Sequence, residues 1–221
     1  MDAIAGIVHE PDGTPEGIVA LTHGAGGSRE SPMLIALCDE WARRGWLAVR
    51  YDLPYRRRRP KGPPSGSATA DLAGIVEAVA AVRALADGPM IAGGHSYGGR
   101  LTSMATAGGA GNSATAGGAG NPTFADHGVA LDVLTLFSYP LHPPGKPERA
   151  RTDHLPRITV PTVFTHGTKD PFGSIDELRR AAALVDAESV VVEITGARHD
   201  LASKTVDVPA LAVEAALRLL R

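Results

Sequence analysis

Short runs of consecutive apolar residues alternate along the chain with longer segments in which apolar residues recur every third or fourth position. Runs of the first kind are typical of parallel strands buried on both faces, and segments of the second kind predict helices with one apolar face. The predicted strands are Gly17–Thr22, Leu47–Tyr51, Met90–Gly93, Leu131–Phe137, Thr162–Thr165 and Ser189–Ile194, with a further candidate at Ala3–His9. This alternation predicts an α/β fold with a mainly parallel central sheet of about seven to eight strands and helices on both faces.

The predicted helices begin at residues that favour helix starts. Ser31 precedes a proline at the first helical position, and Ser174 together with Glu177 forms a capping box. Further helices are expected over Thr69–Ala86, from Ser96 onward, and from Pro209 at the end of the chain. Each predicted helix therefore falls between two predicted strands or after the last one.

The composition is that of an ordinary globular protein, with 221 residues, 43% hydrophobic, 21% charged and a formal net charge of -2. We expect a single domain over residues 1–221. A charge this close to zero argues against a nucleic-acid binder, and no apolar stretch reaches the length of a membrane span, about 18–20 residues. The N-terminus shows no secretory signal, so we expect a cytoplasmic protein. The single cysteine, Cys38, cannot build an internal disulfide or, alone, a structural zinc site.

Two segments interrupt the alternation of strands and helices. The octapeptide Ala105–Asn112 is repeated without change at Ala114–Asn121, which predicts a flexible surface insertion, rich in glycine and alanine, over residues 105–121. The second segment is the arginine run Arg56–Arg59. We interpret this run as a solvated loop, with a patch for an anionic substrate or partner as the alternative.

The first candidate for chemistry is the serine in the sequence Gly94-His-Ser-Tyr-Gly98. A predicted strand comes directly before it and a predicted helix directly after it, which is the setting of a nucleophile elbow. The glycines leave room for a sharp turn, and the turn places the Ser96 hydroxyl at the start of a helix, where negative charge is favoured. The alternative is a tight turn in which Ser96 only caps the helix.

A serine hydroxyl needs a base to take its proton, and position relative to the strands selects among the eight histidines. His199 follows the last predicted strand and is the preferred base, while His142 in a proline-rich loop is the second choice. His95 is expected to face away from the site. Asp170 follows the preceding predicted strand and is expected to orient His199, which gives the chain order serine, acid, histidine. Asp200 is the less favoured acid, because neighbouring side chains on one loop rarely meet correctly.

An acyl-transfer site also needs hydrogen-bond donors for the oxyanion. The backbone N–H of Tyr97 is one candidate, because it directly follows the serine. The other is the N–H of Ala25, in the glycine-rich loop His23–Gly27 that follows an early predicted strand. The substrate pocket is expected to be lined by His23, Leu53, Tyr55, Leu141 and Phe172. No insertion is long enough for a lid domain, so we expect an open site.

Three strings carry a resemblance to a known family: Gly94–Arg100 (GHSYGGR), Ser138–Pro147 (SYPLHPPGKP) and Gly167–Gly173 (GTKDPFG). Over nearly its whole length the chain resembles the α/β-hydrolase superfamily, in its small, lidless, dienelactone-hydrolase-like form. It is similar in particular to a one-domain group of uncharacterised bacterial hydrolases, testis-expressed hydrolase-like proteins and the hydrolase-like region of a subunit of the nonspecific-lethal chromatin complex. The resemblance implies an eight-stranded sheet, a triad of Ser96, Asp170 and His199, and no metal or organic cofactor. It implies no particular substrate.

These features together predict a serine hydrolase that cleaves a small ester or thioester through an acyl-enzyme intermediate. Its expected partner is a small-molecule substrate, with no nucleic acid and no membrane, and the sequence does not indicate an oligomeric state. One alternative is a non-catalytic interaction module that keeps the fold. The other is an acyltransferase that uses the same triad with an acceptor other than water. A complete serine, acid and histidine set at three strand ends argues against the interaction module.

Overall fold

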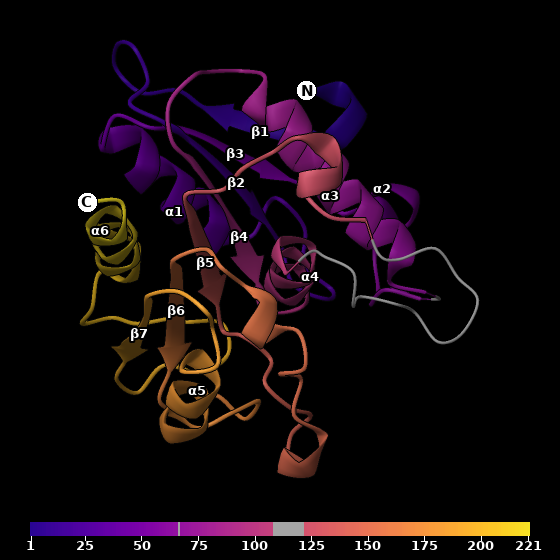
Figure 1. Ribbon diagram of the computed structural model, residues 1–221, viewed down its shortest axis with the longest axis vertical. Helices are drawn as coiled ribbons and strands as arrows, with labels where there is room; N and C mark the ends of the chain where they lie inside the picture. The colour runs from indigo at the N-terminus through magenta and orange to yellow at the C-terminus, as the bar shows by residue number, and fades with distance from the viewer. Residues whose placement is uncertain (66, 108–121) are drawn as a thin grey trace.

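A seven-stranded sheet runs through the centre of the protein (Figure 1). The computed structural model describes residues 1–65, 67–107 and 122–221. The strands are β1 (Gly6–His9), β2 (Ile18–Thr22), β3 (Leu47–Tyr51), β4 (Met90–His95), β5 (Val133–Phe137), β6 (Thr162–Gly167) and β7 (Ser189–Ile194). Their spatial order is β1-β3-β2-β4-β5-β6-β7; β1 runs antiparallel to β3, and all other neighbouring pairs are parallel. The predicted α/β fold is therefore confirmed, with seven strands in the described residues where the resemblance implied eight.

Helices cover both faces of the sheet, because successive side chains of a strand point to opposite faces. The helices are α1 (Pro32–Arg43), α2 (Pro54–Arg58), α3 (Thr69–Arg83), α4 (Ser96–Thr106), α5 (Ile175–Ala182) and α6 (Val208–Leu219). Helices α1 and α6 pack on the face that carries Val19 and Leu21, whereas α3 and α4 pack on the face that carries Ile18 and Ala20. Farther along this second face, α5 packs against β6 and β7, in a cluster that includes Phe164 and Val191. None of the described helices is long and apolar enough to cross a membrane.

Several predicted elements have the expected bounds. The strands over Leu47–Tyr51 and Ser189–Ile194 agree residue for residue. The capping box of α5 is also present, because the Ser174 hydroxyl accepts from the Glu177 N–H and the Glu177 carboxylate accepts from the Ser174 N–H. The candidate strand Ala3–His9 is divided into a short 3-10 helix and β1. The pattern is informative here because nearly every central strand residue is buried, so strands read as continuous apolar runs.

The arginine run Arg56–Arg59 does not form the predicted solvated loop. Its first three residues end the short helix α2, which the sequence pattern did not reveal, and Arg56 is only 5% exposed. The Arg56 guanidinium donates to the backbone carbonyls of Gly27, Arg59 and Gly62. It therefore holds the local backbone and does not face solvent, whereas the other three arginines of the run are exposed.

The first residues of the predicted insertion over residues 105–121 belong to helix α4. Ala105 and Thr106 are the last residues of α4, and Ala107 is its buried C-cap. The remaining residues of the duplicated octapeptide, 108–121, lie outside the described residues.

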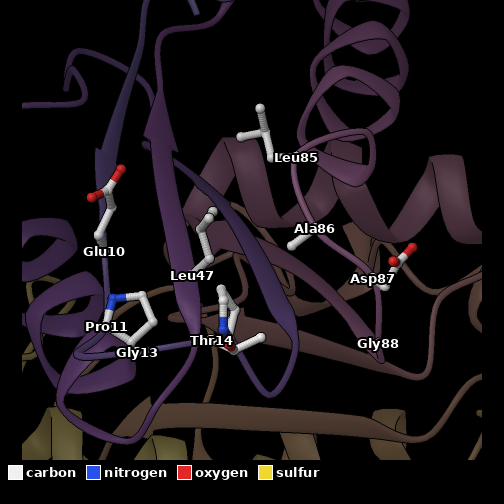
Figure 2. A pocket seen from close by; sticks show the side chains of 10 residues that line it. Glu10, Pro11, Gly13, Thr14, Leu47, Leu85, Ala86, Asp87 and Gly88 are labelled. Carbon is white, nitrogen blue, oxygen red and sulfur yellow. The ribbon is translucent and has the colours of Figure 1, made fainter.

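The loops after β2, β4, β6 and β7 leave the sheet at one edge, because these strands are parallel. In open α/β sheets, ligands bind beyond the carboxyl ends of the strands, which is this edge. A cavity of about 510 Å³ lies at the opposite edge, where it is lined by residues that include Glu10, Leu47, Leu85 and Asp87 (Figure 2). Leu47 begins β3 and Asp87 precedes β4, so this cavity is remote from the loop that follows β4.

Close contact between β4 and β5 depends on a glycine. A Cβ atom on Gly93 would lie 2.1 Å from the carbonyl oxygen of Thr135. We expect Gly93→Ala to lower the free energy of unfolding by about 3 kcal/mol or more, because the two strands must move apart. Urea denaturation measures this loss.

Gly145→Ala is the matched control for this substitution. Gly145 has a φ of 70° and nothing within 4 Å of its Cβ position. The expected cost there is backbone strain alone, about 1–2 kcal/mol. Equal losses in the two variants would contradict the packing argument at Gly93.

Candidate active site

Ser96 lies at the sharp turn between β4 and α4. Its φ is 49°, a left-handed conformation that residues other than glycine rarely adopt. Neighbouring glycines permit the turn: a Cβ on Gly94 would lie 2.8 Å from the carbonyl oxygen of Thr22, and one on Gly98 would lie 2.4 Å from that of His23. The strand, turn and helix predicted around Ser96 are therefore present, and the side chain stands at the N-terminus of α4.

His199 and Asp170 continue a chain of hydrogen bonds that begins at Ser96. The Nε2 atom of His199 lies 2.8 Å from Ser96 Oγ, and its Nδ1 atom lies 2.8 Å from Asp170 Oδ2. Burial by itself raises the pKa of Asp170, but hydrogen bonds from His199 and from the Phe172 N–H outweigh it and hold this pKa below its usual value. The carboxylate keeps the imidazole proton on Nδ1, which leaves Nε2 able to accept the serine proton.

The structure thus brings together the three residues that the sequence order selected, from the loops after β4, β6 and β7. The second-choice histidine is occupied elsewhere: His142 Nδ1 lies 2.8 Å from the Pro143 carbonyl oxygen, and its Nε2 lies 3.6 Å from Glu177. The second-choice acid, Asp200, accepts a hydrogen bond from the Ala202 N–H.

A second serine–histidine pair has the opposite polarity. Ser103 Oγ lies 2.7 Å from His154 Nε2, but the Ser103 hydroxyl donates its proton to the Arg100 carbonyl oxygen at 2.7 Å. His154 must then be the donor in this pair. Burial, together with the nearby charges of Arg100 and Arg157, lowers the pKa of His154 to about 4, and no carboxylate among the described residues orients the ring. This pair therefore lacks an activated hydroxyl.

The loop after β2 lies directly against the serine. A Cβ on Gly24 would lie 3.1 Å from Ser96 Cβ and 2.7 Å from His95 Nδ1. Only a glycine at this position lets the backbone approach so closely. The N–H of Ala25 belongs to the next residue of this loop, and the N–H of Tyr97 is among the first of α4, which have no acceptor within a helix.

The residues predicted to line the pocket are mostly part of the core. His23, Leu53, Tyr55 and Leu141 are 1%, 0%, 4% and 3% exposed. Leu53 cannot line an open pocket, because it is enclosed in the core. His23 cannot do so either, because the residue is buried and both of its ring nitrogens are hydrogen-bonded to backbone groups. Phe172 is partly exposed, and its ring centroid lies 4.3 Å from that of His199. Phe172 is therefore the predicted pocket residue that lies beside the hydrogen-bonded chain.

His95 does not face away from the site as predicted. Its Nε2 lies 2.7 Å from the carbonyl oxygen of His199, and the two rings are 5.1 Å apart. Burial lowers the pKa of His95 to about 4, so the neutral ring donates from Nε2 to that carbonyl. The sequence carries no signal for this contact, because the fold alone brings residues 95 and 199 together.

His166 supports the acid in a similar way. It is fully buried at the end of β6, its Nε2 lies 2.9 Å from the Gly173 carbonyl oxygen, and this bond closes the loop that carries Asp170. A histidine that ends a buried apolar strand was the available sequence signal. Among the described residues, no group of three or more histidine, cysteine, aspartate or glutamate side chains could hold a metal ion.

The sheet order, with a serine at the turn after its central parallel strand, defines the α/β-hydrolase fold. The family model described as alpha/beta hydrolase domain matches residues 15–208, and the chain belongs to this family. The narrower resemblance to the testis-expressed group stays a prediction.

Solved structures with the same fold cover almost the whole chain. Est1E from Butyrivibrio proteoclasticus, solved with bound ferulic acid, has a TM-score of 0.69 at 16% identity and covers 97% of this chain and 93% of its own. A dienelactone hydrolase from Anabaena variabilis has a TM-score of 0.65 at 20% identity, with 96% and 88% covered. A lidless α/β serine hydrolase from Xanthomonas campestris has a TM-score of 0.65 at 17% identity, again with 96% and 88% covered. At sequence identities this low, the structural likeness shows a shared fold and nothing more.

We expect the protein to lose stability as the pH falls below about 6.5. Burial lowers the pKa of His23, His95, His154 and His166, to about 4 for His95 and His154. The unfolded chain takes up protons at its ordinary pKa, so the stability contributed by the neutral rings is complete above about 6.5 and is lost as the pH falls toward about 4. Urea denaturation should show a loss on the order of 3 kcal/mol between pH values of about 7.5 and 5.

Two variants check the cause of this pH dependence. His154→Gln should have a shallower slope, because it removes one buried imidazole. His127→Ala removes an exposed imidazole and should keep the wild-type slope. A free energy of unfolding that does not change over this pH range would contradict the argument.

Proposed function

We propose that this protein is a serine hydrolase that acts on small carboxylic esters or thioesters. The observation that carries the proposal is the hydrogen-bonded chain from Ser96 through His199 to Asp170, with 2.8 Å at each step. A serine at a φ of 49° is strained backbone, which costs about 1–3 kcal/mol and persists where function requires it. An interaction module needs neither this strain nor an accepting histidine beside it.

In the proposed reaction, Ser96 Oγ attacks the substrate carbonyl carbon while His199 Nε2 takes the serine proton. The carboxylate of Asp170 stabilises the imidazolium that forms. The N–H groups of Ala25 and Tyr97 bind the oxyanion of the tetrahedral intermediate. His199 then gives its proton to the leaving alcohol or thiol, which departs and leaves an acyl group on Ser96. His199 Nε2 then takes a proton from a water molecule, which attacks the acyl carbon. The bond to Ser96 Oγ breaks, His199 returns its proton to Oγ, and the carboxylic acid is released.

The site favours small or surface-presented acyl groups. The described loops around Ser96 form no large lid, and Phe172 lies beside His199, where it can contact the substrate. The solved structures with the same fold include a dienelactone hydrolase and Est1E with bound ferulic acid, a compact carboxylic acid. The Arg56 guanidinium is bonded to backbone carbonyls, so it is not available to bind an anionic substrate group.

We expect a fluorophosphonate probe to label Ser96 alone, as mapped by intact and peptide mass spectrometry. Ser96→Ala should lose the label, because the probe reacts with an activated hydroxyl. It should retain only about 10³–10⁴-fold catalysis over water, from substrate binding and the oxyanion donors. His199→Ala should lose the label as well, because no base remains.

Ser103→Ala is the matched control, because it removes the serine of the other serine–histidine pair. This variant should label like wild type. A folded wild-type protein without any label would contradict the hydrolase proposal and favour the interaction module.

Asp170→Asn should lower kcat by about 10⁴-fold, because the amide holds the wrong imidazole tautomer. A panel of p-nitrophenyl esters of increasing chain length measures kcat/KM for the wild type and this variant. We expect the highest values for short acyl chains; a steady rise beyond about ten carbons would contradict an open site. Adding an alcohol acceptor to the same assay separates hydrolysis from acyl transfer, since transfer yields a new ester.

A further inference from the structure

The loop after β2 turns back sharply beside Ser96. Gly24 to Gly27 form a β-turn that is closed by a bond from the Gly27 N–H to the Gly24 carbonyl oxygen at 3.1 Å. Gly26 occupies the third position of this turn with a φ of 81°. This position of the turn needs a positive φ, which glycine adopts readily. The shape of the turn is therefore set by its own backbone, but its orientation toward Ser96 depends on outside contacts.

Two side chains supply those contacts by donating to the Gly24 carbonyl oxygen. His23 Nδ1 lies 2.9 Å from it, and the Tyr55 hydroxyl donates to it at 3.2 Å. The His23 proton must lie on Nδ1, because Nε2 accepts from the Leu53 N–H at 3.1 Å. Burial lowers the pKa of His23, which keeps the ring neutral and this tautomer in place. The Tyr55 oxygen also accepts from the Gly26 N–H at 3.1 Å, so it bridges both sides of the turn.

Holding the Gly24 carbonyl fixes the direction of the next N–H. The carbonyl of Gly24 and the N–H of Ala25 belong to one planar trans peptide unit, so they point in opposite directions. Among the described residues the Ala25 N–H has no acceptor. We propose that Tyr55 is a positioning residue whose hydroxyl, together with His23, aims the Ala25 N–H at the oxyanion of the reacting acyl group. This role rests on the proposed function, because it concerns the same site.

The segment that carries Tyr55 is itself anchored to the site. The Tyr55 N–H donates to the Asp71 carboxylate at 2.8 Å, and the same carboxylate accepts from the Tyr97 hydroxyl at 3.0 Å. Arg56 donates to the Gly27 carbonyl oxygen at 2.6 Å. The segment after β3 is thus hydrogen-bonded to the turn on one side, and on the other side Asp71 of α3 links it to Tyr97 at the start of α4. Because these hydrogen bonds fix the position of Tyr55, its hydroxyl can hold the Gly24 carbonyl in one orientation.

The test is Tyr55→Phe, which removes the hydroxyl and leaves the buried ring. We expect kcat for a short p-nitrophenyl ester to fall about 10- to 100-fold, while KM changes less than about threefold, because the lost interaction acts in the transition state. Affinity for phenylboronic acid, which forms a tetrahedral adduct with an activated serine, should fall by the same factor. The midpoint of the pH dependence of kcat/KM should not move, because Tyr55 does not act on His199.

Tyr51→Phe is the matched control. The Tyr51 hydroxyl is buried in the same core cluster and has no hydrogen-bond partner among the described residues, so its removal should leave kcat unchanged. Circular dichroism establishes that both variants are folded. Wild-type kcat in Tyr55→Phe, or a change in KM alone, would overturn the positioning role while Ser96 labelling of the wild type upheld the hydrolase. An unlabelled wild type would overturn the proposed function and this role together.

Discussion

The arrangement around the candidate site depends on one backbone constraint, the left-handed conformation of Ser96. A serine with a φ of 49° relaxes to a commoner conformation unless its surroundings prevent it. Here β4 enters the turn between β2 and β5, and α4 leaves it packed against α3. Gly94 and Gly98 allow the backbone at the end of β2 and at His23, the next residue, to pack closely against the turn. The packing of the core therefore offsets the strain at Ser96 and holds its hydroxyl within hydrogen-bond distance of His199.

Two serine–histidine pairs at nearly the same distance show that contact alone does not define a site. Ser96 faces a histidine whose other nitrogen is bonded to a carboxylate, so the ring accepts. Ser103 faces a histidine that must donate, because the hydroxyl proton is already given to a helix carbonyl. The third partner decides the direction of the hydrogen bond, and that direction decides which hydroxyl can become a nucleophile.

The sequence predicts the parts of this molecule that depend on local pattern. Buried strands read as apolar runs, and a serine between glycines, an aspartate and a histidine each follow such a run, so Ser96, Asp170 and His199 could be chosen by position. Contacts between distant segments were not predictable in this way. Arg56 resembles its exposed neighbours in sequence, yet its partner Gly27 lies in another loop. Tyr55 and His23 were expected to line a pocket, but their polar atoms are bonded to backbone.

The chemistry is divided between two contiguous stretches of the chain. The proposed nucleophile and both proposed oxyanion donors lie before residue 107, in the loop after β2 and at the start of α4, while Asp170 and His199 lie after residue 122. The two stretches join in the sheet through the pairing of β4 with β5. Neither stretch holds an activated serine by itself. During refolding, reactivity at Ser96 would therefore return only after the two stretches have docked, so it would report the formation of that contact.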